Sequence, residues 1–389
     1  MYKRILYRPI ESGYSFFLLG PRGTGKTTWV RNMLDNEHVY VNLLDANTFR
    51  TLDANPSRIG EYLPKNKERW IFIDEVQRIP EMLNDVHYLI EEGYRFALTG
   101  SSARKLRRGG VNLLAGRARI HTFHPLIMQE IGSEFSLLHA LSYGLLPTSY
   151  KLRKKPEDSL EYLSSYINSY LTEEIKEEGR VRKLSYFNRF LEIASFSQGQ
   201  PINTTNIARE CFVSRLTVDN YFSILEDLLL GSFLPPFTSR AKREIVKQPK
   251  FYFFDVGVYR NLRQMGPLDN ITQVDGPALE TIVLQHLRAI NDYLKRGYRF
   301  YYWRTKYGFE VDFIVYKRGN PIIAIEVKGS DYLNSKDFKG LKSFKEQYSD
   351  SKCYIIYRGS PRKQGEITVM NIVDFLMLIP SLLGAITNT

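Results

Sequence analysis

The segment 20–27 constrains the fold more than any other part of this 389-residue chain. Its sequence, Gly-Pro-Arg-Gly-Thr-Gly-Lys-Thr, fits the pattern G-x-x-x-x-G-K-[ST], follows the apolar run 16–19 and opens a stretch with helical spacing. The pattern is informative where a strand precedes it and a helix follows it. Glycines let backbone N–H groups turn inward around phosphates, and the helix N-terminus adds its positive end. The sequence therefore predicts a strand, a phosphate-binding loop and a helix, in this order.

The polar residues of this loop predict a site for ATP with Mg²⁺. Lys26 is placed to reach the β- and γ-phosphates, and the Thr27 hydroxyl to ligate Mg²⁺. Further contacts with ATP are expected from the rest of the loop and the first turn of the helix, which comprise Gly20, Pro21, Arg22, Gly23, Thr24, Gly25 and Thr28.

An acidic pair ends the apolar run 70–73. Four apolar residues predict a buried strand, and Asp74 at its carboxyl end can hold the Mg²⁺ shell. Glu75 comes next and is placed to polarise the attacking water as a general base. Together with the loop, this strand end predicts hydrolysis of ATP.

Two further residues are candidates for the same site. Ser101 follows the apolar run 95–99 and is expected to hydrogen-bond the γ-phosphate or the water, although ordinary turn chemistry explains Gly-Ser-Ser equally well. Arg117 is a candidate for a charge that stabilises the transition state on a neighbouring subunit. The alternative is a structural or surface arginine. The loop before it is basic and contains Arg104, Lys105, Arg107 and Arg108.

Short apolar runs alternate with helical patterns through the first part of the chain. The runs are 16–19, 39–43, 70–73, 95–99 and 119–123. This βαβ series is typical of a three-layer α/β domain with a parallel sheet. The pattern changes after about residue 145, and the chain is too long for one ordinary domain. We expect three domains: an ATPase core at 1–145, a helical and winged-helix domain at 146–265 and a smaller α/β domain at 266–389.

The middle segment has the sequence outline of a winged helix. A residue of Asn203–Thr205 can cap a helix that ends at Cys211, and Ser214 can cap a second helix over 215–229. Two helices, a basic turn and a strand favour DNA binding. Helical hairpins with solvated charge runs look the same, so this alternative stays open. The basic turn before the apolar strand carries Arg240, Lys242, Arg243, Lys247 and Lys250 against the single acidic Glu244.

Carboxylates and a lysine converge in the last segment. Glu326 and Lys328 alternate at the end of a predicted strand, so their side chains share one face. Asp312 lies on the preceding strand and Glu280 on the helix before both. Carboxylates that meet at one point bind Mg²⁺ or Mn²⁺, with Asp312 and Glu326 as the expected ligands, and a lysine beside them can activate water. The alternative is a β-pair with solvated charges.

These motifs resemble those of prokaryotic AAA-type ATPases that carry a C-terminal domain similar to PD-(D/E)XK nucleases. The matching stretches reach from the first strand to the last domain: 20–27, 72–80, 98–102, 114–117, 254–257, Glu280, Trp303-Arg304, 310–313 and 325–328. The resemblance implies a RecA/AAA-like parallel-sheet ATPase core, a helical plus winged-helix middle and a C-terminal restriction-endonuclease-like α/β domain. It also implies a homo-oligomer, with a hexamer expected. Residues 144–147, Gly-Leu-Leu-Pro, depart from the family pattern, which carries a second glycine before the proline.

In the nuclease-like domain the resemblance assigns catalytic positions to Glu280, Asp312, Glu326 and Lys328. A domain of this type is expected to cleave DNA with Mg²⁺ or Mn²⁺. Folds of this type also survive as binding scaffolds without activity.

Composition narrows the setting in which the protein works. The net charge of +12 makes nucleic acid the first candidate partner, although basic proteins that touch no DNA are common. Cys211 and Cys353 stand in no metal-ligand spacing and are expected in the core of a protein from a reducing compartment. The N-terminus lacks the apolar core of a signal peptide, and the longest apolar stretch, 375–386, is interrupted and too short to span a bilayer. We expect a cytoplasmic protein without a membrane partner.

Three functional hypotheses follow. The leading one is an ATP-driven enzyme that remodels, translocates on or branch-migrates duplex or branched DNA, with a C-terminal domain that binds or cleaves it. The alternative is a nucleotide-dependent switch whose inactive nuclease-like domain is a partner-binding scaffold. The third is a sequence-specific winged-helix regulator whose ATPase only gates binding.

Overall fold

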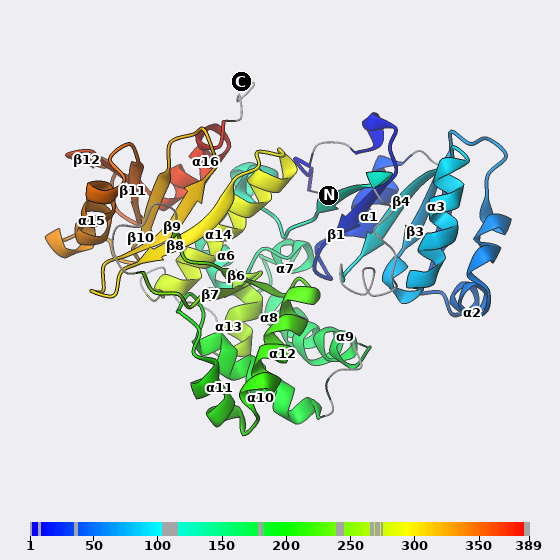
Figure 1. Ribbon diagram of the computed structural model, residues 1–389, viewed down its shortest axis with the longest axis horizontal. Coiled ribbons are helices and arrows are strands. Elements are labelled where there is room, and N and C mark those ends of the chain that lie inside the picture. The colour runs from blue at the N-terminus through cyan, green and yellow to red at the C-terminus, as the bar shows by residue number, and fades with distance from the viewer. Residues whose placement is uncertain are drawn as a thin grey trace. The chain divides into compact units, whose positions relative to one another are not determined.

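The computed structural model of the protein describes residues 2–6, 9–34, 38–102, 116–177, 181, 183–238, 245–264, 268, 273 and 275–384. The chain divides into two compact units. Unit 1 consists of Met1–His124 with Asp227–Leu230, and unit 2 of Pro125–Glu226 with Gly231–Thr389. Figure 1 shows the helices and strands of the two units. The domain boundaries at 145 and 265 stay predictions.

Unit 1 is built around a parallel five-stranded sheet. The strands follow the order β2-β3-β4-β1-β5, and the register pairs Phe16 of β1 with Ala97 of β4. The predicted strands are confirmed to within a residue or so at each end. The elements are β1 (Phe16–Leu19), α1 (Lys26–Met33), β2 (Val39–Asn42), α2 (Ala46–Ala54), β3 (Trp70–Asp74), α3 (Leu83–Glu91), β4 (Arg95–Gly100) and β5 (Arg119–Thr122). Short 3-10 turns lie at Ile10–Ser12, Pro56–Tyr62, Val76–Arg78 and Pro80–Met82.

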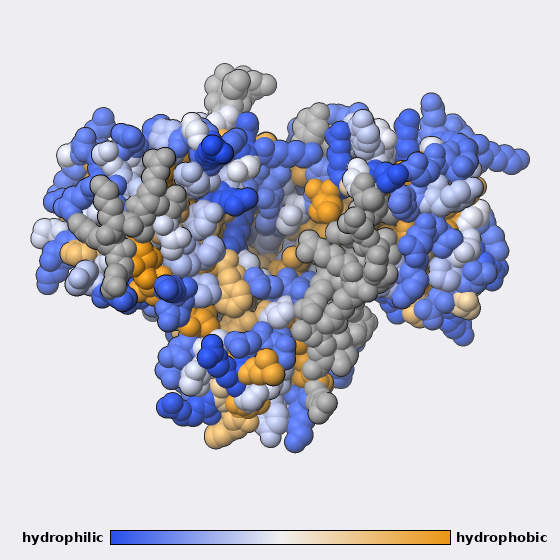
Figure 2. Space-filling model, viewed as in Figure 1, coloured by the Kyte–Doolittle hydropathy of each residue, from blue (hydrophilic) through white to orange (hydrophobic). Residues whose placement is uncertain are grey.

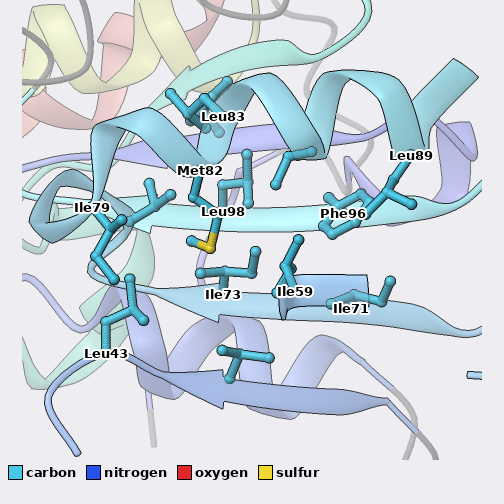
Figure 3. Packing of buried hydrophobic residues seen from close by; sticks show 14 of the residues in the cluster. Leu43, Ile59, Ile71, Ile73, Ile79, Met82, Leu83, Leu89, Phe96 and Leu98 are labelled. Atoms are coloured by element: carbon cyan, nitrogen blue, oxygen red, sulfur yellow. The ribbon is translucent and has the colours of Figure 1, made fainter. Parts of the chain in front are cut away.

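The core of unit 1 forms because its central strands are apolar on both faces. Ile71 and Ile73 of β3 lie beside Leu98 of β4, and Leu83 and Leu89 of α3 pack over them (Figure 3). All of these strands are parallel, so their carboxyl ends meet at one edge of the sheet. The loop after β1, the acidic end of β3 and the end of β4 are therefore brought to the same edge.

The first part of unit 2 is helical. The helices are α5 (Met128–Ile131), α6 (Leu137–Tyr143), α7 (Pro147–Lys151), α8 (Pro156–Ser165), a π-helix (Tyr166–Leu171), α9 (Thr172–Glu177), α10 (Leu184–Phe196), α11 (Thr204–Cys211) and α12 (Arg215–Asp227). Both predicted caps are present, because Asn203 accepts a hydrogen bond from Asn206 N at 3.1 Å and Ser214 accepts one from Thr217 N at 3.1 Å.

An antiparallel pair of strands, β6 (Gly231–Leu234) and β7 (Lys250–Phe253), follows these helices. The segment between the two strands is joined to the next sheet. Phe237 N donates to Tyr302 O at 2.7 Å, and Val246 N to Arg304 O at 2.9 Å. Phe237 and Ile245 also belong to the hydrophobic core of that sheet. Of the predicted basic turn, Arg240, Lys242 and Arg243 lie outside the described residues, and Lys247 is exposed.

The remainder of unit 2 is a mixed six-stranded sheet with helices. Its strand order is β12-β13-β11-β10-β9-β8, with β10, β11 and β13 parallel and β8, β9 and β12 antiparallel to their neighbours. The bounds are α13 (Val256–Leu262), α14 (Gly276–Tyr293), β8 (Arg299–Arg304), β9 (Glu310–Tyr316), β10 (Ile323–Val327), a 3-10 turn (Ser335–Phe338), α15 (Lys339–Gln347), β11 (Lys352–Tyr357), β12 (Arg362–Gln364), β13 (Ile367–Asn371) and α16 (Ile372–Leu382). The predicted pairing of the strands that carry Asp312 and Glu326 is confirmed.

The face of the molecule drawn in Figure 2 is mostly hydrophilic, with scattered apolar patches. Cys211 and Cys353 are both buried free thiols, in agreement with their expected place in the core. Within the described residues we find no helix with the length and apolar character needed to cross a membrane.

Candidate functional site

The loop after β1 has the backbone that phosphate binding requires. Gly23 and Gly25 have φ of 81° and 91°, in the left-handed region that side chains with a Cβ rarely adopt. Thr24 Oγ1 donates to Pro21 O at 2.8 Å and closes the turn. Lys26 begins α1 at the end of this turn. The loop is thus held in a tight arc at the N-terminus of a helix.

Lys26 is buried, and its ammonium lies inside the arc. Nζ donates to Gly20 O at 2.7 Å and to Pro21 O at 3.1 Å. The positive charge is therefore held among backbone groups of the loop, where a phosphate would be bound. Pro21 is buried, Arg22 and Gly23 are partly buried, and Thr28 is exposed on the first turn of α1.

Thr27 and Asp74 meet across the carboxyl edge of the sheet. Thr27 Oγ1 lies 3.0 Å from Asp74 Oδ1 and 2.9 Å from Oδ2. Tyr40 OH donates to Asp74 Oδ2 at 3.1 Å, and the Thr99 hydroxyl donates to Oδ1. Burial raises the pKa of Asp74 above its usual value, against the hydrogen bonds that lower it. A hydroxyl and a carboxylate at this distance fit the hard oxygen ligands that Mg²⁺ prefers.

Glu75 is held in an unusual backbone conformation beside this pair. Its φ of 59° lies in the left-handed region, which is uncommon for a residue with a side chain and is found at functional sites. Gln77 Nε2 donates to Glu75 Oε2 at 2.5 Å and to Ser101 Oγ at 3.1 Å. Ser101, which was predicted to hydrogen-bond the γ-phosphate or the water, is thus connected to Glu75 through Gln77.

Three residues of this site were not predicted from the sequence: Tyr40, Gln77 and Thr99. Tyr40 and Thr99 lie on the strands beside β3, and both bond Asp74. Their places depend on strand order, which a single sequence does not reveal. Gln77 stands two residues after Glu75, and this closeness to the acidic pair in the sequence could have identified it as a residue of the site.

Arg117 forms an ion pair with Glu91 at the end of α3, and its side chain is partly exposed. This ion pair agrees with the alternative that Arg117 is a structural arginine. A role of Arg117 on a neighbouring subunit stays a prediction. The basic residues Arg104, Lys105, Arg107 and Arg108 lie outside the described residues.

The residues predicted to converge in the last segment do converge. Asp312 Oδ2 accepts from Val327 N at 2.8 Å, and Lys328 Nζ donates to Glu326 Oε1 at 2.6 Å. Glu280, from α14, accepts from Tyr252 OH at 2.6 Å. These carboxylates and Lys328 line one cavity of about 450 Å³.

The place of Lys250 differs from the prediction. We predicted it as part of the basic turn before the apolar strand, but it begins β7, its side chain is 1% exposed and it lies within the carboxylate cluster. Nζ is 2.6 Å from Glu310 Oε1 and 3.7 Å from Asp312 Oδ1. Alternation along Lys250–Phe253 puts Lys250 on the same face of β7 as Tyr252, which also reaches the cluster.

Burial and mutual repulsion set the electrostatics of the cluster. Burial raises the pKa of Glu280 to about 7, with the charge of Asp312 acting in the same direction. Burial also raises the pKa of Asp312 and of Glu326. For Lys250, burial lowers the pKa, but the charges of nearby carboxylates outweigh burial, so its pKa is raised. Among the described residues, no group of three or more His, Cys, Asp or Glu side chains is arranged to hold a metal ion.

Comparison with known protein families divides the chain into three parts. Residues 13–132 match the family described as an AAA domain. Residues 134–269 match a domain of unknown function (DUF8612), and residues 275–375 match another (DUF4143). The N-terminal part is therefore an AAA-domain P-loop ATPase, and its parallel five-stranded sheet is consistent with an AAA core. Such a domain implies binding of ATP with Mg²⁺.

Similar proteins occur in bacteria and archaea. Proteins of Mycobacterium tuberculosis and Mycobacterium bovis are each 28% identical over 323 residues, which cover 81% of this chain and 70% of theirs. A protein of Methanocaldococcus jannaschii is 21% identical over 397 residues, with 93% and 86% covered. All three are named uncharacterized proteins. Their names carry no statement about a substrate or a partner.

Proposed function

We propose that this chain is a Mg²⁺-dependent ATPase that uses hydrolysis of ATP to act on DNA. The observation that carries the ATPase part is the meeting of Lys26, Thr27, Asp74 and Glu75 at one edge of a parallel sheet. These residues come from two separate parts of the sequence. Their positions meet the needs of phosphate binding, metal binding and activation of water together.

Each residue has a distinct task in this proposal. Lys26 binds the β- and γ-phosphates, and Thr27 with Asp74 holds Mg²⁺, which when bound neutralises charge on the phosphates. Glu75 orients a water and takes its proton as the water oxygen bonds to the γ-phosphorus. The bond to the bridging oxygen breaks, and ADP and phosphate are released. Gln77 holds the Glu75 carboxylate in place through its amide.

The DNA part of the proposal is supported by charge and by the order of elements in unit 2. The chain has a net charge of +12. Helices α10, α11 and α12 are followed by the antiparallel pair β6–β7, which is the element order of a winged helix. Arg215 begins α12 and is exposed, in the position from which a recognition helix contacts DNA.

ATP hydrolysis measured with and without DNA tests this proposal. Single-stranded, duplex, forked and four-way DNAs are compared at equal nucleotide concentration, with heparin as a control for negative charge alone. We expect at least one DNA to raise the rate severalfold and heparin to have little effect. A rate that no DNA changes would remove the DNA part and leave the ATPase.

A specific observation favours a second candidate, a nucleotide-dependent switch whose C-terminal domain is a partner-binding scaffold. Lys250 supplies a cation at the carboxylates that a nuclease would need for its metal ion. The two candidates differ in the response of ATP hydrolysis to DNA, which the comparison above measures. Incubation of the same DNA panel with Mg²⁺ or Mn²⁺ tests the C-terminal domain, because nicking that is lost in Asp312→Ala but independent of Lys26 supports a nuclease. A panel left uncut with both metals supports the scaffold.

A further inference from the structure

A buried lysine stands among the carboxylates of unit 2. Lys250 is on β7, Asp312 and Glu310 are on β9, and Glu280 is on α14. Because the Lys250 side chain is almost fully excluded from solvent, its charge is compensated by these groups and not by water. From this geometry we infer that Lys250 is the resident cation of the cluster and that the cluster takes no divalent metal ion. The inference is independent of the proposed ATPase.

The donors of the protein already engage each carboxylate. Glu310 is paired with Lys250 at 2.6 Å and with Arg304 at 3.4 Å. Asp312 is 3.7 Å from Lys250 and accepts from a backbone N–H. Glu326 is paired with Lys328, and Glu280 accepts from the Tyr252 hydroxyl. A metal ion, which is held by one or two carboxylates with water completing its shell, would have to compete with these donors.

One buried carboxylate oxygen of the cluster has no hydrogen-bond partner. Among the described residues, Glu326 Oε2 is the buried carboxylate oxygen of the cluster without a hydrogen-bond partner. The Lys250 ammonium close to Asp312 repels a second cation that approaches this oxygen. The ion would have to displace that ammonium.

Lys250 is held against such displacement from both sides. On one side, the segment before β7 is hydrogen-bonded to β8 through Val246, and Ile245 lies in the core of the sheet. On the other side, Tyr252 anchors β7 to Glu280. The ammonium also lies 5.4 Å from the centre of the Tyr302 ring, which favours a cation. The ion pairs and hydrogen bonds of the cluster therefore hold β7 against β9 and α14.

Binding of Mn²⁺ to the nucleotide-free full-length protein, measured by electron paramagnetic resonance, tests the inference. All variants carry Asp74→Asn, which removes the metal ligand of the ATP site. We expect the same amount of bound Mn²⁺ with Asp312 intact and in Asp312→Asn. We also expect Lys250→Met, a substitution close in shape, to gain one Mn²⁺ per chain that Asp312→Asn removes again.

Two results would contradict the inference. In the protein that keeps Lys250, one more Mn²⁺ per chain with Asp312 intact than in Asp312→Asn would overturn the inference. A folded Lys250→Met that gains no Mn²⁺ would overturn the claim that Lys250 excludes the ion. If Lys250→Met does not fold, the comparison between intact Asp312 and Asp312→Asn still decides, and Glu326→Gln serves as its repeat at the second predicted ligand.

Discussion

At the scale of single residues, Asp74 shows how many groups the nucleotide site depends on. Its carboxylate is bonded by Thr27 from α1, Tyr40 from β2 and Thr99 from β4. These hydrogen bonds hold a buried charge in one orientation, which a metal ligand needs. The same strand end positions Glu75, so binding and hydrolysis share one structural support.

Replacement of Lys26 tests the binding part of the site. Lys26→Ala removes the cation that the loop holds at Gly20 O and Pro21 O. We expect affinity for ATP to fall by about a hundredfold, which corresponds to about 3 kcal/mol, the range of charge-assisted hydrogen bonds. Titration with a fluorescent ATP analogue measures the change. Lys67→Ala, at an exposed lysine of the same unit, is the matched control and should bind normally.

Sequence patterns identified the chemistry of single residues better than their partners. Lys26, Thr27, Asp74 and Glu75 stand in local motifs whose spacing is set by one strand end and one helix start. Lys250 was misplaced because its role depends on carboxylates 30 to 76 positions further along the chain, brought near it by the fold. No local pattern distinguishes such a lysine from the basic residues before it in the sequence.

At the scale of elements, the junction between α6 and α13 is unusually tight. Gly144 ends α6, and Asp255 caps α13 by accepting from Val258 N at 3.1 Å. The buried Asp255 carboxylate also accepts from Leu145 N at 2.7 Å, and burial raises its pKa to about 6. Residues 144–147 lack the second glycine of the family pattern, but they keep Gly144, the glycine that this contact needs.

Replacement of Gly144 tests this junction. A Cβ on Gly144 would lie 2.0 Å from Asp255 Oδ1, so Gly144→Ala should lower the free energy of unfolding by about 3 kcal/mol or more. Gly132→Ala is the matched control. Gly132 has φ 68° and ψ −138°, close to the φ 74° and ψ −167° of Gly144, but no atom lies within 4 Å of its Cβ position. Equal losses in urea unfolding would show that backbone strain alone accounts for the effect.

A buried histidine on α14 predicts sensitivity to acid. His286 Nδ1–H donates to Ile282 O at 2.8 Å, so Nε2 is left to accept from Met128 N at 2.9 Å. Burial lowers the pKa of His286 to about 4. A base with a lowered pKa in the folded state stabilises the protein above its unfolded pKa near 6.5, and this contribution is lost as pH falls toward 4.

Replacement of His286 by glutamine isolates that contribution. The amide oxygen of the introduced glutamine can accept the same N–H, but the amide does not titrate. Between pH 7 and pH 5, the free energy of unfolding of the natural protein should fall by about 2 kcal/mol more than that of His286→Gln. Urea unfolding at the two pH values measures the difference. Parallel losses in the two proteins would show that His286 is not the source.

Elements were predicted more accurately than the connections between them. The strands of unit 1 were found because each is a short apolar run bounded by polar turns, and α11 and α12 because each has a capping residue. The join between the β6–β7 segment and β8 was not predicted. It depends on pairing between distant strands, which periodicity along one chain does not encode.

At the scale of the whole molecule, the open question is whether Arg117 acts within one chain or on another. If Arg117 stabilises the transition state on a neighbouring subunit, the active protein is an oligomer. Arg117→Ala should then lower ATP turnover by about a thousandfold. Mixing Lys26→Ala with Arg117→Ala chains should restore part of the activity at shared interfaces. A protein that is strictly monomeric by light scattering and has full ATP turnover would contradict this prediction.

The ion pair with Glu91 provides the control for that experiment. If Arg117 only pairs with Glu91, then Glu91→Gln and Arg117→Ala should lower the free energy of unfolding by the same small amount, because a partly exposed ion pair contributes about 1 kcal/mol or less to stability. Neither substitution should then change ATP turnover strongly. If Arg117 acts in trans, Glu91→Gln should keep nearly full turnover.

The measurement that tests the central claim most directly is ATP turnover by Glu75→Gln at saturating ATP and Mg²⁺. The substitution keeps the size of the side chain and its acceptor for Gln77 but removes the base. We predict ATP affinity close to that of the natural protein and a turnover rate lower by about a hundredfold or more. Glu81→Gln, at an exposed glutamate of the same unit, should be unchanged. Normal turnover in Glu75→Gln would contradict the account, because the base would then lie elsewhere.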